Sequence, residues 1–147
     1  MANATMEKFG FPATLVHQFE HWAVLVRPAQ VTLGSLVLVA TGEAVAYGDL
    51  PAEAFTEQGR AVKAIERALA EFTRYERINY LMLMMVDPHV HFHVIPRYPE
   101  PREWNGKSFA DAGWPGQPAL GSAVTLEPAD IESLAKALKS AIAGNLD

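Results

Sequence analysis

The sequence predicts an α+β domain built on an antiparallel sheet. Runs of apolar, β-prone residues occupy the first third of the chain, and two more follow a long stretch with helical periodicity. A second helical stretch closes the chain, so strands and helices are grouped and do not alternate as in a parallel α/β fold. With 147 residues, half of them hydrophobic, we expect a single domain spanning residues 1–147.

Three strands are expected before residue 41. Residues 14–17 suit a short edge strand, and residues 22–27 give a stronger strand pattern. Residues 35–40 are almost wholly apolar, which is typical of a central strand. The segment from Arg27-Pro28 to Leu33-Gly34 is expected to turn the chain between the second and third strands.

Two helices are expected. Pro51 suits the first turn of a helix that runs to about Tyr75, with Asp49 as the candidate cap. The apolar residues that recur at helical spacing along it, and that we expect in the core, are Phe55, Val62, Ile65, Leu69 and Phe72. The second helix covers residues 127–143, with Pro128 in its first turn and Gly144 as its stop.

The region between the helices is expected to hold two strands and a long loop. Residues 77–86 suit a buried strand whose methionines fill core space, and Asp87-Pro88 turns the chain into the next strand. Residues 96–124 are rich in Pro and Gly, and an irregular segment of that length in a compact domain usually has a function.

The fifth expected strand carries three of the five histidines at alternate positions. Successive side chains of a strand point to opposite faces. His89, His91 and His93 are therefore expected on one face, while Val90 and Phe92 with their apolar neighbours face the core. The pattern predicts a row of imidazoles on a rigid support.

The length of this row favours phosphate chemistry over metal binding. At ~3.4 Å per residue the outer two Cα atoms lie ~13 to 14 Å apart, so one metal ion could reach two neighbours but hardly all three. The middle ring could face a phosphorus atom while its neighbours donate to the flanking oxygens. A neutral imidazole is a ready nucleophile, and a backbone carbonyl that holds its Nδ1–H would aim Nε2 outward. A purely structural row and a zinc site are the competing interpretations.

The heptapeptide His-Val-His-Phe-His-Val-Ile, followed by Pro-Arg, resembles the signature of the histidine triad (HIT) superfamily of nucleotide hydrolases and transferases. The resemblance extends more loosely over residues 10–120. It implies a five-stranded antiparallel sheet flanked by two helices, and a homodimer. It also implies that His91 attacks the α-phosphate of a nucleotide to form a covalent nucleotidyl-histidine, with His89 and His93 binding phosphate and handling protons.

Two departures from that family's pattern bear on the substrate. Gly34-Ser35 and Arg27 stand where the family commonly has Gly-His and a polar Asn or Asp, and Met-Met-Val-Asp-Pro stands where it has a glycine-rich segment with Gln and Ser or Thr. Arg27 and Ser35 are candidate substrate-binding residues for this reason, and Arg97 and Trp114, from the end of the histidine strand and the segment that follows it, are two more. Arg102 and Lys107 are further candidate phosphate contacts, with surface charge as the alternative for both.

The resemblance implies an enzyme that cleaves at the α-phosphate of a purine nucleotide conjugate. The four cations Arg27, Arg97, Arg102 and Lys107 favour a dinucleoside polyphosphate-like substrate. Trp114-Pro115-Gly116 is similar to a piece found in the phosphoramidase branch, so a nucleoside phosphoramidase is one alternative. A nucleotide-sensing or metal-binding module without catalysis is the other.

Composition sets the remaining expectations. A net charge of −5 does not favour a nucleic-acid partner, and the absence of cysteine excludes thiolate chemistry. The first ten residues lack the apolar stretch of a signal peptide, and the longest apolar runs are too short to cross a membrane. We expect a cytoplasmic protein with no membrane partner that needs no cofactor or protein-bound metal, although a divalent metal can accompany a polyphosphate substrate.

Overall fold

The computed structural model describes residues 2–146 and contains a five-stranded antiparallel sheet with the strand order β1-β2-β4-β6-β5. Its strands are β1 (Leu15–Gln18), β2 (Trp22–Val26), β4 (Leu36–Ala40), β5 (Arg77–Leu81) and β6 (His91–Arg97). The long helices are α2 (Ala52–Thr73) and α3 (Pro128–Ala143), and a short helix, α1 (Ala4–Lys8), precedes the sheet. The predicted α+β class, antiparallel sheet and two long helices are confirmed.

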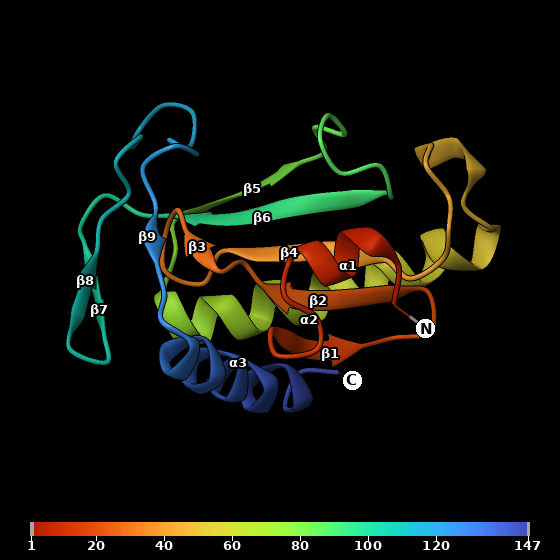
Figure 1. Ribbon diagram of the computed structural model, residues 1–147. Coiled ribbons are helices and arrows are strands. Elements are labelled where there is room, and N and C mark those ends of the chain that lie inside the picture. The colour runs from red at the N-terminus through yellow and green to blue at the C-terminus, as the bar shows by residue number, and fades with distance from the viewer. Residues whose placement is uncertain (1, 147) are drawn as a thin grey trace.

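The sheet is covered on both faces (Figure 1). The helices α2 and α3 pack on one face, against a core that includes Val24, Leu38 and Val94. The helix α1 lies on the other face, where Met6 contacts a smaller cluster with Leu25 and Val39. The histidine strand β6 lies inside the sheet, between β4 and the edge strand β5.

The register between β4 and β6 decides which residues share the histidine face. Val37 pairs with His93 and Val39 pairs with His91, and paired residues of antiparallel strands point to the same side. His91 and His93 therefore lie on the face that α1 covers. Phe92, which pairs with Leu38, lies on the face toward α2, as the alternating pattern predicts.

The start and the core face of α2 differ from the prediction. Pro51 occupies the N-cap position without a side-chain cap bond, while Asp49 ends a short 3₁₀ helix (Tyr47–Asp49), so Asp49 is not the cap. Phe55 is exposed and packs its ring on Tyr47, and Val62 and Phe72 are only partly buried. The core face is made mainly of small residues, which allow the helix to approach the sheet closely: Ala54, Ala61, Ala64 and Ala68 with Ile65 and Leu69.

The predicted strand over residues 77–86 is wrong in its second half. Strand β5 ends at Leu81, which pairs with His93, and its partner β6 begins only two residues before that position. The chain must then leave the sheet and return over residues 82–90. Met82 and Met84 still pack against the core, but Met85 and Val86 are 85% and 79% exposed, so the predicted core role fails for Met85.

Residues 96–124 are more ordered than a continuous loop. Strands β7 (Arg102–Trp104) and β8 (Lys107–Phe109) form a hairpin whose turn residues, Asn105 and Gly106, have φ values of 51° and 77°. Two consecutive positive φ values are those of a type I′ turn, for which Asn-Gly is a strong sequence signal. Further on, β9 (Val124–Thr125) pairs with β3 (Ala29–Gln30), within the turn that precedes β4.

Candidate active site

The structure brings the three histidines together but places only two of them on the strand. His91 and His93 are neighbours on one face of β6, with ring centroids 5.3 Å apart and ring planes at 83°. His89 lies before the strand, at a bend in the chain, so the prediction that all three belong to one strand is wrong. All three are buried, with 2% of His91 and 8% of His93 exposed.

The backbone orients the ring of His91. Its Nδ1 lies 2.7 Å from the carbonyl oxygen of His89, and because a carbonyl only accepts, His91 carries its proton on Nδ1. Nε2 of His91 has no hydrogen-bond partner, and no completely buried side-chain nitrogen or oxygen in residues 2–146 lacks one. Nε2 therefore presents an accessible lone pair, in the orientation predicted from the sequence.

His93 has the opposite arrangement. Nε–H of Arg27 donates to Nδ1 of His93 over 3.4 Å. Burial lowers the pKa of His93 to about 4, assisted by the positive charge of Arg27 and by His91, with Asp87 acting in the other direction. His93 is therefore neutral at pH 7.

His89 is held at both ring nitrogens. Thr5 Oγ1 accepts from the backbone N–H of His89 at 3.2 Å and lies 2.9 Å from Nδ1, to which its own proton can be donated. Nε2 lies 3.1 Å from a carboxylate oxygen of Glu43, which can only accept. These contacts fix both the orientation and the tautomer of the first histidine.

The N-terminal segment completes the site, and sequence reasoning missed it. The Phe9 ring lies 5.9 Å from the ring of His91 and 5.7 Å from that of His93. Lys8 forms an ion pair with Asp87 at 3.2 Å. The one available signal was Asn3, a good N-cap residue, whose side chain accepts from Met6 N–H; a helix of five residues shows no periodicity.

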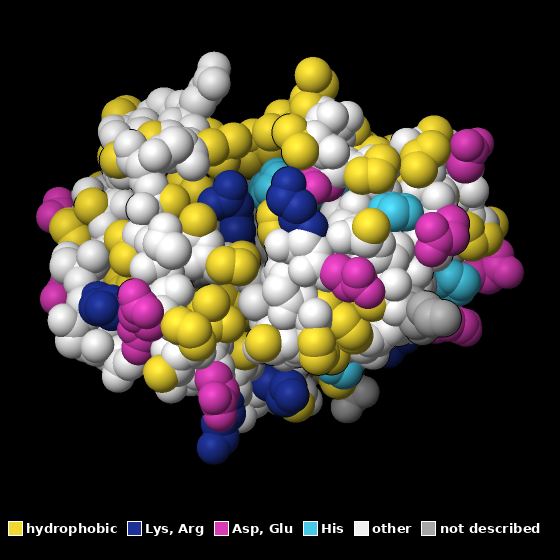
Figure 2. All heavy atoms as spheres, viewed as in Figure 1, with side chains coloured by type: hydrophobic (Ala, Val, Ile, Leu, Met, Phe, Trp, Pro, Cys, Tyr) yellow, Lys and Arg dark blue, Asp and Glu magenta, His cyan; other side chains and the backbone are white. Residues whose placement is uncertain are grey.

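On the surface, the site is a hollow with positive charge at its sides. Figure 2 shows a histidine side chain at the floor of a hollow, with a Lys or Arg side chain on either side of it. Among the described residues, the cations with contacts to this region are Arg27, through His93, and Lys8, through Asp87. This arrangement suits an anionic group placed over Nε2 of His91.

The hydroxyl of the candidate residue Ser35 makes its hydrogen bonds within the turn before β4. Ser35 is fully buried, its hydroxyl donates to the Thr32 carbonyl at 2.8 Å, and it accepts from Thr32 N–H at 3.0 Å. The preceding Gly34 has a φ of 92°, and a Cβ there would meet a Leu69 methyl at 3.0 Å. These contacts favour a structural role for the Gly34-Ser35 pair.

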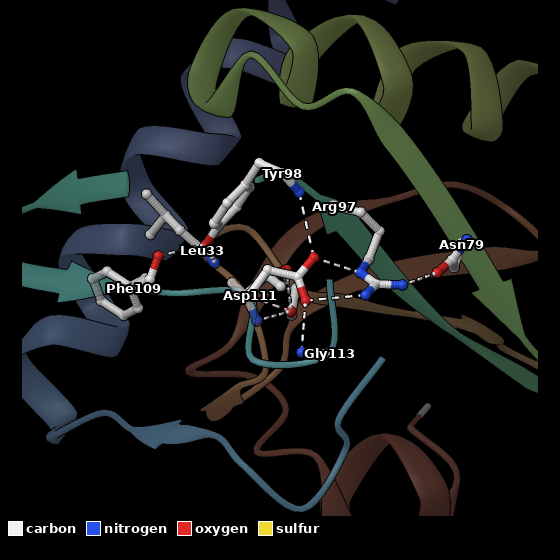
Figure 3. A network of polar contacts seen from close by, with 9 residues as sticks. Leu33, Asn79, Arg97, Tyr98, Phe109, Asp111 and Gly113 are labelled. Carbon is white, nitrogen blue, oxygen red and sulfur yellow. Dashed lines mark hydrogen bonds and ion pairs between the residues drawn. The ribbon is translucent and has the colours of Figure 1, made fainter. Parts of the chain in front are cut away.

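The candidate Arg97 is part of a buried network at the other end of β6 (Figure 3). Its Nε and one terminal nitrogen donate to the two carboxylate oxygens of Asp111 at 2.6 and 3.0 Å, and the other terminal nitrogen donates to Asn79 at 2.7 Å. Asp111 also accepts from the backbone N–H groups of Tyr98 and Gly113. Arg97 is 4% exposed and its charge is paired with Asp111, so it has a structural role in this network.

The three remaining candidates, Trp114, Arg102 and Lys107, contact other parts of the molecule and not the histidines. Trp114 lines a cavity of about 590 Å³ together with Arg97 and residues 77–79 and 115–118. Arg102 donates to the carbonyls of Thr73 and Arg74 at the C-terminal end of α2 and stacks on Tyr98. Lys107 pairs with Asp130 at the start of α3. Of the four predicted phosphate-binding cations, Arg27 is the one in contact with the histidines.

No group of three or more His, Asp or Glu side chains in residues 2–146 is arranged to hold a metal ion. No helix in the same range is long and apolar enough to cross a membrane.

Solved structures resemble this chain, whereas no protein-family profile and no curated protein matches it. A histidine triad protein from Bradyrhizobium japonicum superimposes with a TM-score of 0.73 at 21% identity, covering 97% of both chains. A histidine triad protein from Sinorhizobium meliloti gives 0.68 at 19% identity over 95% of both chains. Diadenosine triphosphate hydrolase from Plasmodium falciparum gives 0.65 at 14% identity, covering 92% of this chain and 80% of that one.

The protein is of the α+β class, with a five-stranded antiparallel sheet that carries helices on both faces. An inner strand of this sheet holds two buried histidines, which line the candidate site. The structural matches identify the architecture within that class. This chain has the histidine triad fold, which confirms the prediction made from the histidine motif.

Proposed function

We propose that this protein is a nucleotide-binding hydrolase or transferase that cleaves at the α-phosphate of purine nucleotide conjugates through a covalent nucleotidyl-His91. The observation that carries the proposal is the arrangement of the His91 ring. Its Nδ1–H is held by the His89 carbonyl at 2.7 Å, while among the described residues Nε2 has no hydrogen-bond partner and is not completely buried. A buried imidazole with one fixed proton and one accessible lone pair is suited to nucleophilic attack.

In the proposed reaction the bond from Nε2 to the α-phosphorus forms as the bond to the leaving group breaks. His91 keeps its Nδ1 proton, so the ring becomes positively charged, and the His89 carbonyl stabilises that charge. Water or another acceptor then attacks the phosphorus, the P–N bond breaks, and its electron pair returns to Nε2. His89 and His93 serve as phosphate-binding and proton-handling partners.

Two cations support a substrate with more than one phosphate. Arg27 and Lys8 lie near the histidines, and charge-assisted contacts to phosphate are stronger than neutral ones. The sequence suggested four cations for this role, but Arg97, Arg102 and Lys107 have other partners, so fewer cations support a polyphosphate substrate. We keep a dinucleoside polyphosphate-like conjugate as the proposed substrate.

A nucleoside phosphoramidase is the second candidate, and two exposed apolar side chains in the loop that leads to His89 are the observation in its favour. Met85 and Val86, just before Asp87 in the loop that leads to His89, are 85% and 79% exposed. Apolar side chains in the loop that precedes the first histidine suit an uncharged leaving group better than a polyphosphate.

The test is incubation with diadenosine polyphosphates and with adenosine 5′-phosphoramidate, with AMP release followed by chromatography. Turnover of the first substrate class, absent in His91→Asn, supports the main proposal, and preference for the second supports the phosphoramidase. Binding of these nucleotides by calorimetry without any turnover would replace the enzyme with a sensing module. Stoichiometric zinc in untagged protein would indicate a metal-binding module.

We also propose that the protein is a homodimer. β5 is an edge strand of the sheet, so its outer backbone groups can pair with another strand. The loop after β5 exposes Leu83, Met85 and Val86, which form an apolar surface next to that edge. A second copy of the chain would cover both features.

A further inference from the structure

Arg27 is held rigidly in place beside His93. It follows β2, where its backbone N–H donates to the Ser35 carbonyl at 3.0 Å and its carbonyl accepts from the Gln30 side chain at 2.6 Å. Its guanidinium donates to the Ala29 carbonyl at 2.6 Å and, through Nε–H, to Nδ1 of His93 at 3.4 Å. Both ends of this side chain are fixed, so its direction toward the imidazole is set by the turn.

A guanidinium contains only donors and keeps its charge at any relevant pH. A ring nitrogen that receives its N–H must therefore carry a lone pair. Nδ1 of His93 is consequently unprotonated, and in a neutral imidazole the single proton then resides on Nε2. This is the opposite tautomer from that of His91, whose proton is fixed on Nδ1.

We propose that Arg27 is a positioning residue that fixes His93 in the Nε2–H tautomer, so that neighbouring rings present one lone pair and one N–H donor to the same phosphate. The proposal rests on the proposed function of the site. His91 supplies the attacking electron pair, and His93 donates a hydrogen bond to a phosphate oxygen. With the tautomers exchanged, His93 would present a second lone pair to an anion and repel it.

The surroundings of His93 favour a neutral ring. The charged or titratable groups that face it are Arg27 from the turn after β2, His91 from the same strand and Asp87 from the preceding loop, whereas α1 contributes the apolar ring of Phe9. Burial and Arg27 lower the pKa of His93, and Asp87 opposes them more weakly. His93 therefore meets the phosphate as a neutral ring that donates a hydrogen bond.

The first experiment is nuclear magnetic resonance of protein with ¹⁵N-labelled histidine, without substrate. In the unsubstituted protein, long-range ¹H–¹⁵N spectra between about pH 5 and 8 are expected to show His93 protonated at Nε2 and unprotonated at Nδ1. In Arg27→Met, His93 is expected to become a mixture of both tautomers, with a raised pKa. In Arg27→Gln, whose amide can still donate, the Nε2–H tautomer is expected to be largely retained.

Lys8→Met is the matched control, because Lys8 is also a cation near the histidines but contacts Asp87 and not His93. This variant is expected to leave the tautomer of His93 unchanged. An Nδ1–H tautomer in the unsubstituted protein overturns the proposal, even where Arg27→Met does not fold. So does a tautomer that is the same with and without Arg27.

Turnover provides the second readout. Loss of the donor arrangement in Arg27→Met is expected to lower kcat by about 100-fold, with partial recovery in Arg27→Gln. A change in KM alone would make Arg27 a simple substrate contact and overturn the positioning role. If no nucleotide is cleaved by any form but the tautomer still depends on Arg27, the proposed function fails while the inference about His93 stands.

Discussion

Two chemically identical side chains, His91 and His93, acquire different properties from a single hydrogen bond each. The partner of His91 is a backbone carbonyl that requires a proton on Nδ1, and the partner of His93 is a guanidinium that excludes one. The difference in function therefore lies in the neighbours of each ring. Substitutions at the two positions are expected to have different consequences.

Replacement of His91 by asparagine is expected to lower kcat by at least about 1,000-fold, since the attacking lone pair is lost. Folding and nucleotide binding are expected to remain largely intact, and substitutions of His89 and His93 should cost less. Turnover, circular dichroism and calorimetric binding measure the three quantities. His17→Asn, the same change on β1 outside the row, is the control, and a near-normal rate in His91→Asn would refute the assigned nucleophile.

The lowered pKa of His93 predicts a loss of stability in acid. Protonation is easier in the unfolded chain, at about 6.5, than in the folded protein, at about 4. The contribution of the neutral ring is therefore complete above about pH 6.5 and lost as the pH falls toward 4, by roughly 1 to 3 kcal/mol. Urea unfolding at pH 7 and pH 4.5 should show a smaller difference for His93→Gln than for the unsubstituted protein; equal differences would mean that His93 is charged in the folded state.

At the scale of elements, the strands that build the sheet were predictable because their apolar, β-branched runs are unambiguous. Strand β5 was predicted too long, since the point where its partner β6 begins cannot be read from β5 itself. The β7–β8 hairpin carried a readable signal in Asn105-Gly106. The contacts of His89 with Thr5, 84 positions away, and of Arg27 with His93, 66 positions away, had no local signal.

The helix α1 is expected to depend on Asn3. This buried side chain caps the helix through Met6 N–H and donates to the carbonyls of Ala40 and Gly42, which ties α1 to the end of β4. Asn3→Ala should lower the free energy of unfolding by about 2 kcal/mol and increase hydrogen exchange over residues 4–8.

Asn3→Asp separates the two roles of this side chain. Aspartate keeps the capping oxygen but loses the amide N–H groups that donate to the Ala40 and Gly42 carbonyls. An exchange rate in α1 close to that of Asn3→Ala would therefore assign the effect to these two hydrogen bonds. A rate close to that of the unsubstituted protein would assign it to the cap.

At the scale of the whole molecule, the loop that follows the edge strand β5 exposes apolar side chains, and we expect the protein in solution to have the mass of a dimer. Replacing Met85 and Val86 together by aspartate should yield a folded monomer, because both side chains are exposed within one chain. Size-exclusion chromatography with light scattering measures the mass.

Val45→Asp is the control for this substitution, since Val45 is 58% exposed on a different loop. It should leave the dimer intact. A monomeric unsubstituted protein would refute the dimer, and a dimeric double variant would place the interface elsewhere.

The buried pair of Arg97 and Asp111 limits how this sequence can diverge. Removal of one partner leaves a charge with little access to water and is expected to cost about 3 to 5 kcal/mol, a large part of the stability of an ordinary domain. Exchange of both for apolar residues of similar volume is far less harmful. Descendants of this chain should therefore keep both residues or lose both. Positions 97, at the end of the histidine strand, and 111, in the segment that follows it, are thus expected to change together in evolution.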